Sequence, residues 1–221
     1  MRLTFISDTH GKHLELTDSI LGSGDILIHC GDVSTIGTFD EITNFLDWFS
    51  KTNFTHKIFI AGNHDFWFTK THNISENYAD DNVTYLFDSS VIINGIKFYG
   101  SPWQPKFHNW AFNMDRNSDD LNNVWSKIPY DTDVLITHTP PYGILDIVNQ
   151  SRVGCELLFD HVKKINPIIH VFGHIHGSYG QRSTNNTEYI NASCLDDNYF
   201  FKNKPITVDL DTTTKNFSYI H

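Results

Sequence analysis

The chain is poor in cysteine, with only Cys30, Cys155 and Cys194, and it contains no Cys-x-x-Cys pair. Three cysteines cannot all pair within one chain, so the sequence predicts free thiols in a reducing compartment, and we expect a cytoplasmic protein. The same scarcity excludes a structural zinc site built from cysteines.

Long apolar runs are also missing. Residues 1–10 include Arg2 and Asp8 and do not resemble a signal peptide. No segment has the roughly 20 apolar residues that a transmembrane helix needs, so we expect no membrane association.

Basic residues are scarce, with 16 Lys and Arg against 26 Asp and Glu, which gives a formal net charge of -10. Such a surface repels nucleic acid, and no basic stripe compensates, so we expect no nucleic-acid polymer as partner and disfavour a DNA nuclease. Acidic side chains can still hold metal ions, and bound cations reverse the local charge of a site. A small phosphoester or nucleotide substrate is therefore compatible with this composition.

Signatures of several other hydrolases are absent. The sequence has no His-Glu-x-x-His, no Gly-x-Ser-x-Gly and no complete P-loop.

The chain does have enough apolar residues for a core, since 39% of its 221 residues are hydrophobic. We expect one domain that spans residues 1–221. Apolar runs rich in β-branched residues predict strands, and these lie at residues 3–6, 26–30, 57–60, 83–87, 91–101, 134–137, 168–172, 188–191 and 206–210. Strands alternate with helices early and follow one another later, which favours a mixed α/β sandwich.

Two helices are predicted from apolar residues that recur on one face, at residues 39–49 and 155–165. Thr38 and Glu41 have the spacing of a capping box at the start of the first helix. Asn94-Gly95 predicts a hairpin turn, and residues 115–120 predict a solvated loop. His29 and His170 lie within predicted strands and are expected to be packing residues.

Polar side chains follow five of the predicted strands, at the point where each strand ends. They are Asp8 and His10, then Asp32, then Asn63, His64 and Asp65, then His138, and finally His174 and His176. Open α/β sheets bind ligands at the carboxyl edge of their strands, so these side chains could converge on one site.

Imidazole and carboxylate together suit divalent transition metals, and we expect two ions, with manganese first and iron, cobalt, nickel or zinc as alternatives. In an extended backbone, residues two apart point the same way, so Asp8 and His10 could reach one ion. His174 and His176 could serve one ion each, and Asp32 is the natural bridge.

The five blocks, Gly62-Asn63-His64-Asp65 above all, resemble the calcineurin-like metallophosphoesterase superfamily. Residues 98–105, 110–113, 133–143, 172–176 and 190–193 are similar to its metallophosphoesterase-domain-containing subfamily. The resemblance implies a four-layer α-β-β-α sandwich with two mixed β-sheets. It implies one metal held by Asp8, His10, Asp32 and His176, and a second held by Asp32, Asn63, His138 and His174.

The resemblance also implies His64 as proton donor, oriented by Asp65, and a hydroxide that bridges the metals and attacks phosphorus. The implied activity is that of a metal-dependent phosphodiesterase on small nucleotide-type or cyclic nucleotide esters. Aromatic side chains near the predicted site, Trp103, His108, Trp110 and Tyr142, could stack on a nucleobase. The alternatives are a metal-containing nucleotide-binding regulatory or scaffold protein with low turnover, and a phosphomonoesterase or protein phosphatase.

Overall fold

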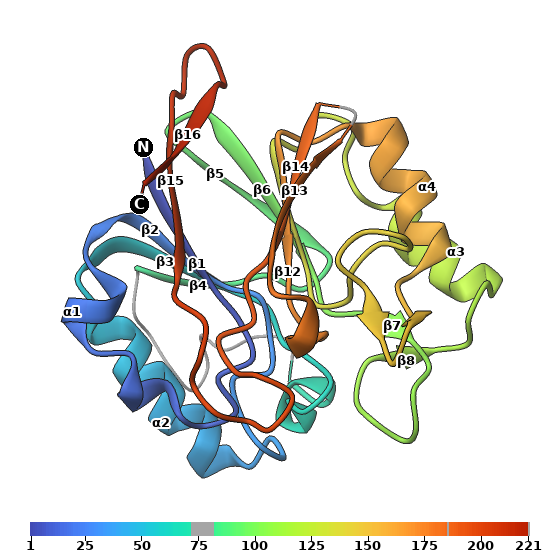
Figure 1. Cartoon of the computed structure of the whole chain (residues 1–221), viewed down its shortest axis with the longest axis horizontal. Coiled ribbons are helices and arrows are strands. Elements are labelled where there is room, and N and C mark those ends of the chain that lie inside the picture. Colours follow the sequence, from blue (N-terminus) through green and yellow to red (C-terminus); the bar gives the residue numbers. More distant parts are fainter. Residues whose placement is uncertain (72–81, 185, 221) are drawn as a thin grey trace.

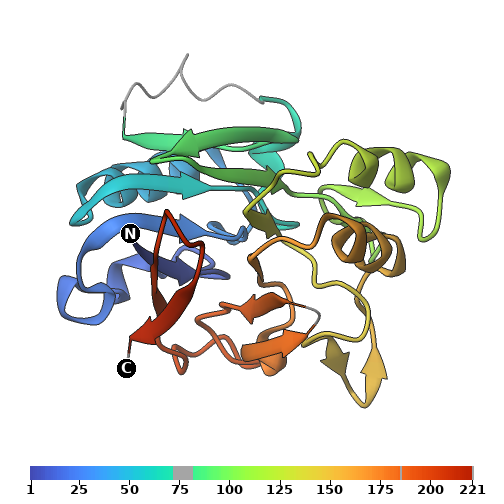
Figure 2. The same cartoon turned by 90° about the horizontal axis from the view of Figure 1, so that it is seen from above.

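The computed structural model describes residues 1–71, 82–184 and 186–220, and it consists of two face-to-face sheets with helices outside them (Figures 1 and 2). The first sheet has the strand order β16-β15-β1-β2-β3-β4. Its strands are β1 (Arg2–Ile6), β2 (Gly24–His29), β3 (Phe54–Phe59), β4 (Val83–Tyr85), β15 (Ile206–Leu210) and β16 (Phe217–Ile220). β1 to β4 are parallel, whereas β15 joins β1 antiparallel and β16 joins β15 antiparallel.

The second sheet has the order β13-β14-β12-β9-β6-β5. Its strands are β5 (Ser89–Ile93), β6 (Ile96–Ser101), β9 (Val134–Thr137), β12 (Ile169–Phe172), β13 (Gly180–Thr184) and β14 (Thr187–Asn191). The four inner strands are parallel, and β5 and β13 are antiparallel edges. Two short pairs lie outside the sheets: β7 (Gln104–Pro105) with β8 (Asn113–Met114), and β10 (Ile147–Val148) with β11 (Ser151–Arg152).

The helices are α1 (Asp18–Leu21), α2 (Phe39–Lys51), α3 (Asp119–Ser126) and α4 (Glu156–Ile165). The described residues also form three short 3-10 helices, η1 (His13–Glu15), η2 (Phe66–Thr69) and η4 (His176–Ser178). None of the helices in the described part of the chain is long and apolar enough to cross a membrane.

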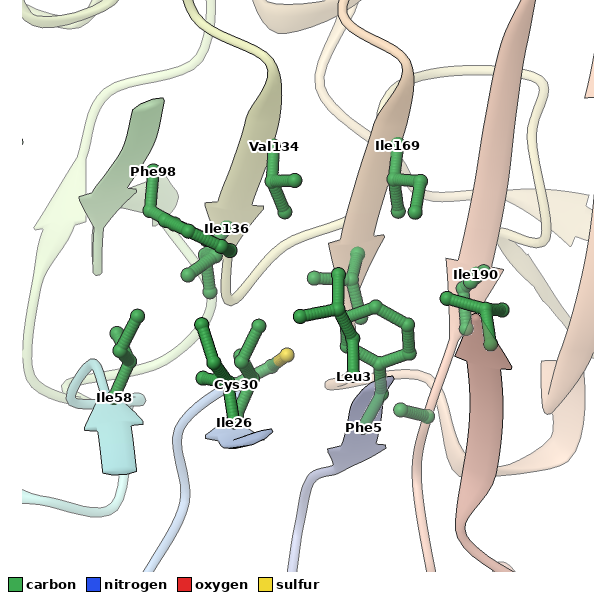
Figure 3. Close-up of a cluster of buried hydrophobic side chains, with 14 of the residues drawn as sticks. Leu3, Phe5, Ile26, Cys30, Ile58, Phe98, Val134, Ile136, Ile169 and Ile190 are labelled. Atoms are coloured by element: carbon green, nitrogen blue, oxygen red, sulfur yellow. The ribbon is translucent and has the colours of Figure 1, made fainter. Parts of the chain in front are cut away.

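Three buried apolar clusters hold these layers together. One lies between the sheets, where side chains such as Leu3 and Ile26 point toward Phe98 and Ile169 (Figure 3). A second joins the outer face of the first sheet to α2, and a third joins the second sheet to α3 and α4. The expected four-layer sandwich with two mixed sheets is therefore confirmed.

Local predictions were mostly right. α2 begins with the expected capping box, in which the Thr38 side chain accepts a hydrogen bond from the Glu41 N–H. Asn94 and Gly95 both have positive φ, 51° and 79°, and connect β5 to β6 in a hairpin. The prediction of a loop through residues 115–120 was wrong at its end, because Ser118 caps α3 and Asp119 and Asp120 form its first turn.

Cys30, Cys155 and Cys194 are buried and free.

Candidate functional site

The predicted polar residues gather at one edge of the sandwich, beyond the carboxyl ends of β1, β2 and β3 in one sheet and β9 and β12 in the other. Their ligand atoms form three overlapping groups, each with all atoms within 4.8 Å of one another. The groups are Asp8 with His10 and His176, Asp32 with His138 and His174, and His10 with Asp32 and His64. Both sheets therefore contribute to one compact cluster.

The backbone reaches this cluster in a way that the sequence did not indicate. Asp8, His10, Asp32 and His174 all have left-handed backbone, with φ values of 55°, 43°, 55° and 68°. Asp8 and His10 do share one ligand group as expected, but not because the strand is extended, since β1 ends at Ile6 and both residues lie in the left-handed backbone that follows. Left-handed backbone costs free energy outside glycine, and such strain collects at functional sites.

Asp8 lies at the centre of the first group. Its two oxygens accept hydrogen bonds from the His174 N–H at 3.1 and 3.0 Å, and Oδ2 accepts one from Ser193 Oγ at 2.7 Å. Oδ1 lies 3.5 Å from His176 Nε2. Burial favours the neutral carboxyl, but the hydrogen bond from His176 and the nearby histidines outweigh it and hold the pKa of Asp8 well below its usual range. Asp8 is therefore a buried anion.

The second group is organised around Asp32. His138 Nδ1 donates to the Cys30 carbonyl at 2.9 Å, so Nε2 is the nitrogen that faces Asp32 Oδ2 at 3.4 Å and Asn63 Oδ1 at 3.0 Å. Burial opposes protonation of His138, but the Asp32 carboxylate outweighs burial and raises the pKa of His138 to about 9. The same interaction lowers the pKa of Asp32 against the opposing effect of burial.

The donor set fits divalent cations. His176 Nδ1 donates to the Asp196 carbonyl at 3.1 Å, which leaves Nε2 facing inward, 3.3 Å from Nε2 of His10. Two imidazole nitrogens that face each other this closely need a proton or a metal ion between them. With the carboxylates of Asp8 and Asp32 beside them, they form a nitrogen and oxygen cage of the kind that binds transition metals.

His64 and Asp65 follow the same strand but have separate surroundings. His64 Nδ1 lies 2.7 Å from the Thr35 carbonyl oxygen, so Nδ1 carries the proton and donates it there. The buried Asp65 carboxylate accepts hydrogen bonds from the N–H groups of Val33, Ser34 and Gly62 and from the Ser34 hydroxyl.

Among the described contacts, none joins the Asp65 carboxylate to the His64 ring directly, so an orienting role of Asp65 would act through the neighbouring backbone. Asp65 fixes the backbone of residues 33–34, and the carbonyl of the next residue, Thr35, holds the imidazole. Burial and the charge of Asp32 raise the pKa of Asp65 to about 6, although its hydrogen bonds favour the carboxylate.

A hollow of about 160 Å³ opens over the cluster. It is lined by His10, Asp32, Asn63, His64, Phe107, Trp110, His174, His176 and Tyr199. Of the four predicted substrate contacts, Trp110 is in this lining. Trp103 donates to Asp88 at 3.0 Å and lines a neighbouring hollow, while His108 and Tyr142 are exposed residues outside the lining described.

Phe107 and Tyr199 are the lining residues that sequence reasoning missed. Phe107 directly precedes His108, and the sequence analysis predicted His108, not Phe107, as a substrate contact. The Tyr199 ring lies 4.9 Å from the ring of His10 and 5.2 Å from that of His176. The φ of Tyr199 is 61°, in the left-handed region. No local sequence pattern predicts this conformation for a tyrosine.

A larger hollow of about 1040 Å³ lies around Arg2, Asp25 and Asp209, and no histidine is among the residues that line it. Size therefore does not identify the functional site in this molecule. The clustered ligand atoms do.

Comparison with known proteins agrees with this geometry. A family model described as calcineurin-like phosphoesterase matches residues 1–178. The chain is 40% identical to metallophosphoesterase domain-containing protein 1 of Homo sapiens and of Mus musculus, over 96% of its own length and 71% of theirs.

Solved structures share the fold at low identity. The crystal structure of TT1561 of Thermus thermophilus has a TM-score of 0.62 at 14% identity, covering 99% of this chain and 97% of that one. Phosphopantetheinyl hydrolase from Mycobacterium tuberculosis has a TM-score of 0.57 at 17% identity, covering 86% and 88%.

Proposed function

Because the chain belongs to the calcineurin-like phosphoesterase family, we propose that it is a dinuclear metal-dependent phosphodiesterase that acts on small nucleotide-type esters, cyclic nucleotides included. The observation that carries the proposal is the convergence of two groups of carboxylate and imidazole ligands from both sheets within one cluster.

In this proposal one ion is held by Asp8, His10, Asp32 and His176, and the other by Asp32, Asn63, His138 and His174. Manganese is our first choice, and iron, cobalt, nickel and zinc suit the same donors. Two such ions lower the pKa of bound water toward neutrality and neutralise phosphate oxygens.

The chain's own residues have further tasks. His64 donates a proton to the leaving alkoxide, through the Nε2 that its bond to the Thr35 carbonyl leaves free. Asn63 presents its side-chain oxygen beside His138. Phe107 and Tyr199 form apolar walls of the hollow and exclude water from the organic part of the ester.

The first test is hydrolysis of bis-p-nitrophenyl phosphate by metal-stripped protein, before and after Mn²⁺ is added back. We expect activity to return with the metal. In Asn63→Ala the activity should fall by more than about 100-fold. Loss of a residue that only supports a metal ligand already costs up to about 100-fold, and Asn63 is proposed as a ligand itself. Asn123→Ala, an exposed change in α3, is the matched control and should keep full activity.

His64→Ala should separate the proton donor from the metal ligands. Nitrophenolate leaves without a proton, so activity on bis-p-nitrophenyl phosphate should change little, whereas esters with an alkoxide leaving group should lose about 10²–10⁴-fold. Protein that binds the metals and nucleoside monophosphate yet hydrolyses no ester would instead identify a nucleotide-binding scaffold.

A further inference from the structure

Trp110 has a stacked ring contact that no other described residue makes with the proton donor. Its indole stacks on the His64 imidazole, with ring centroids 4.1 Å apart and planes inclined by 30°. The next residue ties this segment to the site, because the Ala111 N–H donates to the Asn63 carbonyl at 3.0 Å. Trp110 is therefore fixed beside the loop that carries both Asn63 and His64.

The other contacts of His64 leave its ring incompletely restrained. Nδ1 is anchored to the Thr35 carbonyl, and the ring of His10 approaches at 4.6 Å with its plane at 85°. The outer side-chain torsion of histidine is broad, so one hydrogen bond lets the ring swing about that anchor. A flat surface against the imidazole face removes this freedom.

Trp110 is also a wall between two hollows. It lines the site hollow and the adjacent hollow of about 390 Å³, whose aromatic lining includes Phe66, Phe87 and Trp103. The indole face toward the site is covered by His64, so this face does not receive a nucleobase. Stacking on the substrate, which the sequence suggested for Trp110, is thus replaced by stacking on a catalytic group.

We propose that Trp110 is a positioning residue for the proton donor: its indole holds the His64 imidazole so that Nε2 meets the leaving oxygen of the ester. The inference rests on the proposed function, since it concerns the proton that His64 gives. A general acid must come within about 2.6–3.2 Å of the atom it protonates, and small rotations of the ring break that condition.

The decisive experiment compares two diesters that differ only in the leaving group, ethyl phenyl phosphate and ethyl p-nitrophenyl phosphate, with Mn²⁺-loaded protein. Trp110→Leu should lower kcat on the phenyl ester by about 10-fold, the effect of losing one stacked aromatic pair. It should leave kcat on the nitrophenyl ester near that of the unchanged protein. Trp110→Phe, which keeps a ring face, should retain most of the phenyl activity.

Controls separate positioning from general damage. Trp103→Leu removes an indole that lies in the adjacent hollow, and should not discriminate between the two esters. Manganese content should be the same in all variants. In the His64→Ala background, Trp110→Leu should cause no further loss on the phenyl ester, because the two residues act as one unit.

A second readout does not depend on turnover. The indole shifts the NMR signals of the His64 ring protons through its ring current, so these signals should move in Trp110→Leu. Unmoved signals, equal losses on both esters, or additive losses with His64→Ala would each overturn the positioning role. If the unchanged protein hydrolyses neither ester while the NMR shift is present, the proposed function fails and the stacking contact stands.

Discussion

At the scale of single residues, Gly173 decides how closely the two sheets can approach at the site. A β-carbon there would lie 2.1 Å from Asp8 Oδ2 and 2.1 Å from Ser7 Oγ, well inside any allowed contact. The next residue, His174, uses its N–H to hold both oxygens of Asp8. Because Gly173 has no side chain, Asp8 can come close enough to accept these hydrogen bonds from the His174 N–H.

We predict that Gly173→Ala weakens Mn²⁺ binding by at least about 10-fold, because Asp8 must move. It should also lower the free energy of unfolding by about 1–3 kcal/mol through overpacking. Metal titration and urea unfolding check both effects.

Gly22→Ala is the matched control, since a β-carbon at Gly22 meets nothing within 4 Å but suffers from the positive φ of 72°. It should cost about 1–2 kcal/mol of stability and leave metal affinity unchanged. Equal metal affinities in the two variants would contradict the steric role of Gly173.

At the scale of elements, the start of α2 is connected to His64, the proposed proton donor. Glu41 accepts the Thr38 N–H at 3.0 Å as part of the capping box, and the Thr35 N–H at 2.9 Å. The carbonyl of Thr35 is the one that holds His64. One carboxylate therefore caps a helix and restrains the segment that holds the His64 imidazole.

Glu41→Ala removes the helix cap and should therefore lower the free energy of unfolding by about 1 kcal/mol. It also frees Thr35, so it should lower activity on ethyl phenyl phosphate as well. Thr38→Ala breaks the cap but leaves the bond between Glu41 and Thr35 in place, so it should lose stability alone. Unfolding measurements and the ratio of rates on phenyl and nitrophenyl esters distinguish the two. A normal ratio in Glu41→Ala would mean that Thr35 holds its position without it.

The strands, the two long helices and the position of the metal-ligand candidates could be predicted because they follow from short-range patterns. Continuous apolar runs identify β1 and β9, a helical repeat identifies α2, and glycine-flanked polar residues mark where several strands end. α3 was missed because its Asp119 and Asp120 look like a solvated loop, although the Ser118 cap and the burial of Leu121, Val124 and Trp125 on one face are those of a helix.

Contacts that depend on distant segments could not be predicted. Tyr199 reaches the site from a loop far along the chain, and the partner of His64 turned out to be a backbone carbonyl, which carries no sequence signal. His29 and His170 were expected to pack in strands. They do so, and each also bonds a threonine beside a ligand candidate, Thr9 at 3.0 Å and Thr137 at 2.8 Å.

At the scale of the whole molecule, these two buried histidines make the fold sensitive to acid. Burial lowers the pKa of both His29 and His170 to about 3, while an unfolded histidine titrates near about 6.5. Between these values the unfolded chain binds more protons than the folded one. The stability they contribute is therefore present above pH 6.5 and is lost as the pH falls toward 3.

We predict that, in metal-free protein, each such histidine lowers the free energy of unfolding by about 1.4 kcal/mol for each unit by which the pH falls within this range. His170→Gln keeps a donor for the Thr137 hydroxyl but does not titrate. Its stability, measured by urea unfolding between pH 7 and pH 5 with a chelator present, should decline less steeply than that of the unchanged protein. Parallel declines would show that His170 is already protonated in the fold.

The path of the chain between the sheets also bears on how the protein is made. β1 is an inner strand of the first sheet, and its partner on one side is β15, with Arg2 opposite Asp209. Asp8, just past β1, likewise depends on His174 and Ser193 for its hydrogen bonds. On the ribosome, which releases the chain from its N-terminus, the first strand leaves the exit tunnel long before its partner exists. Nascent chains should therefore carry an open edge at β1 until β15 has been made, and the cluster of candidate ligands should stay incomplete until His176 has been made.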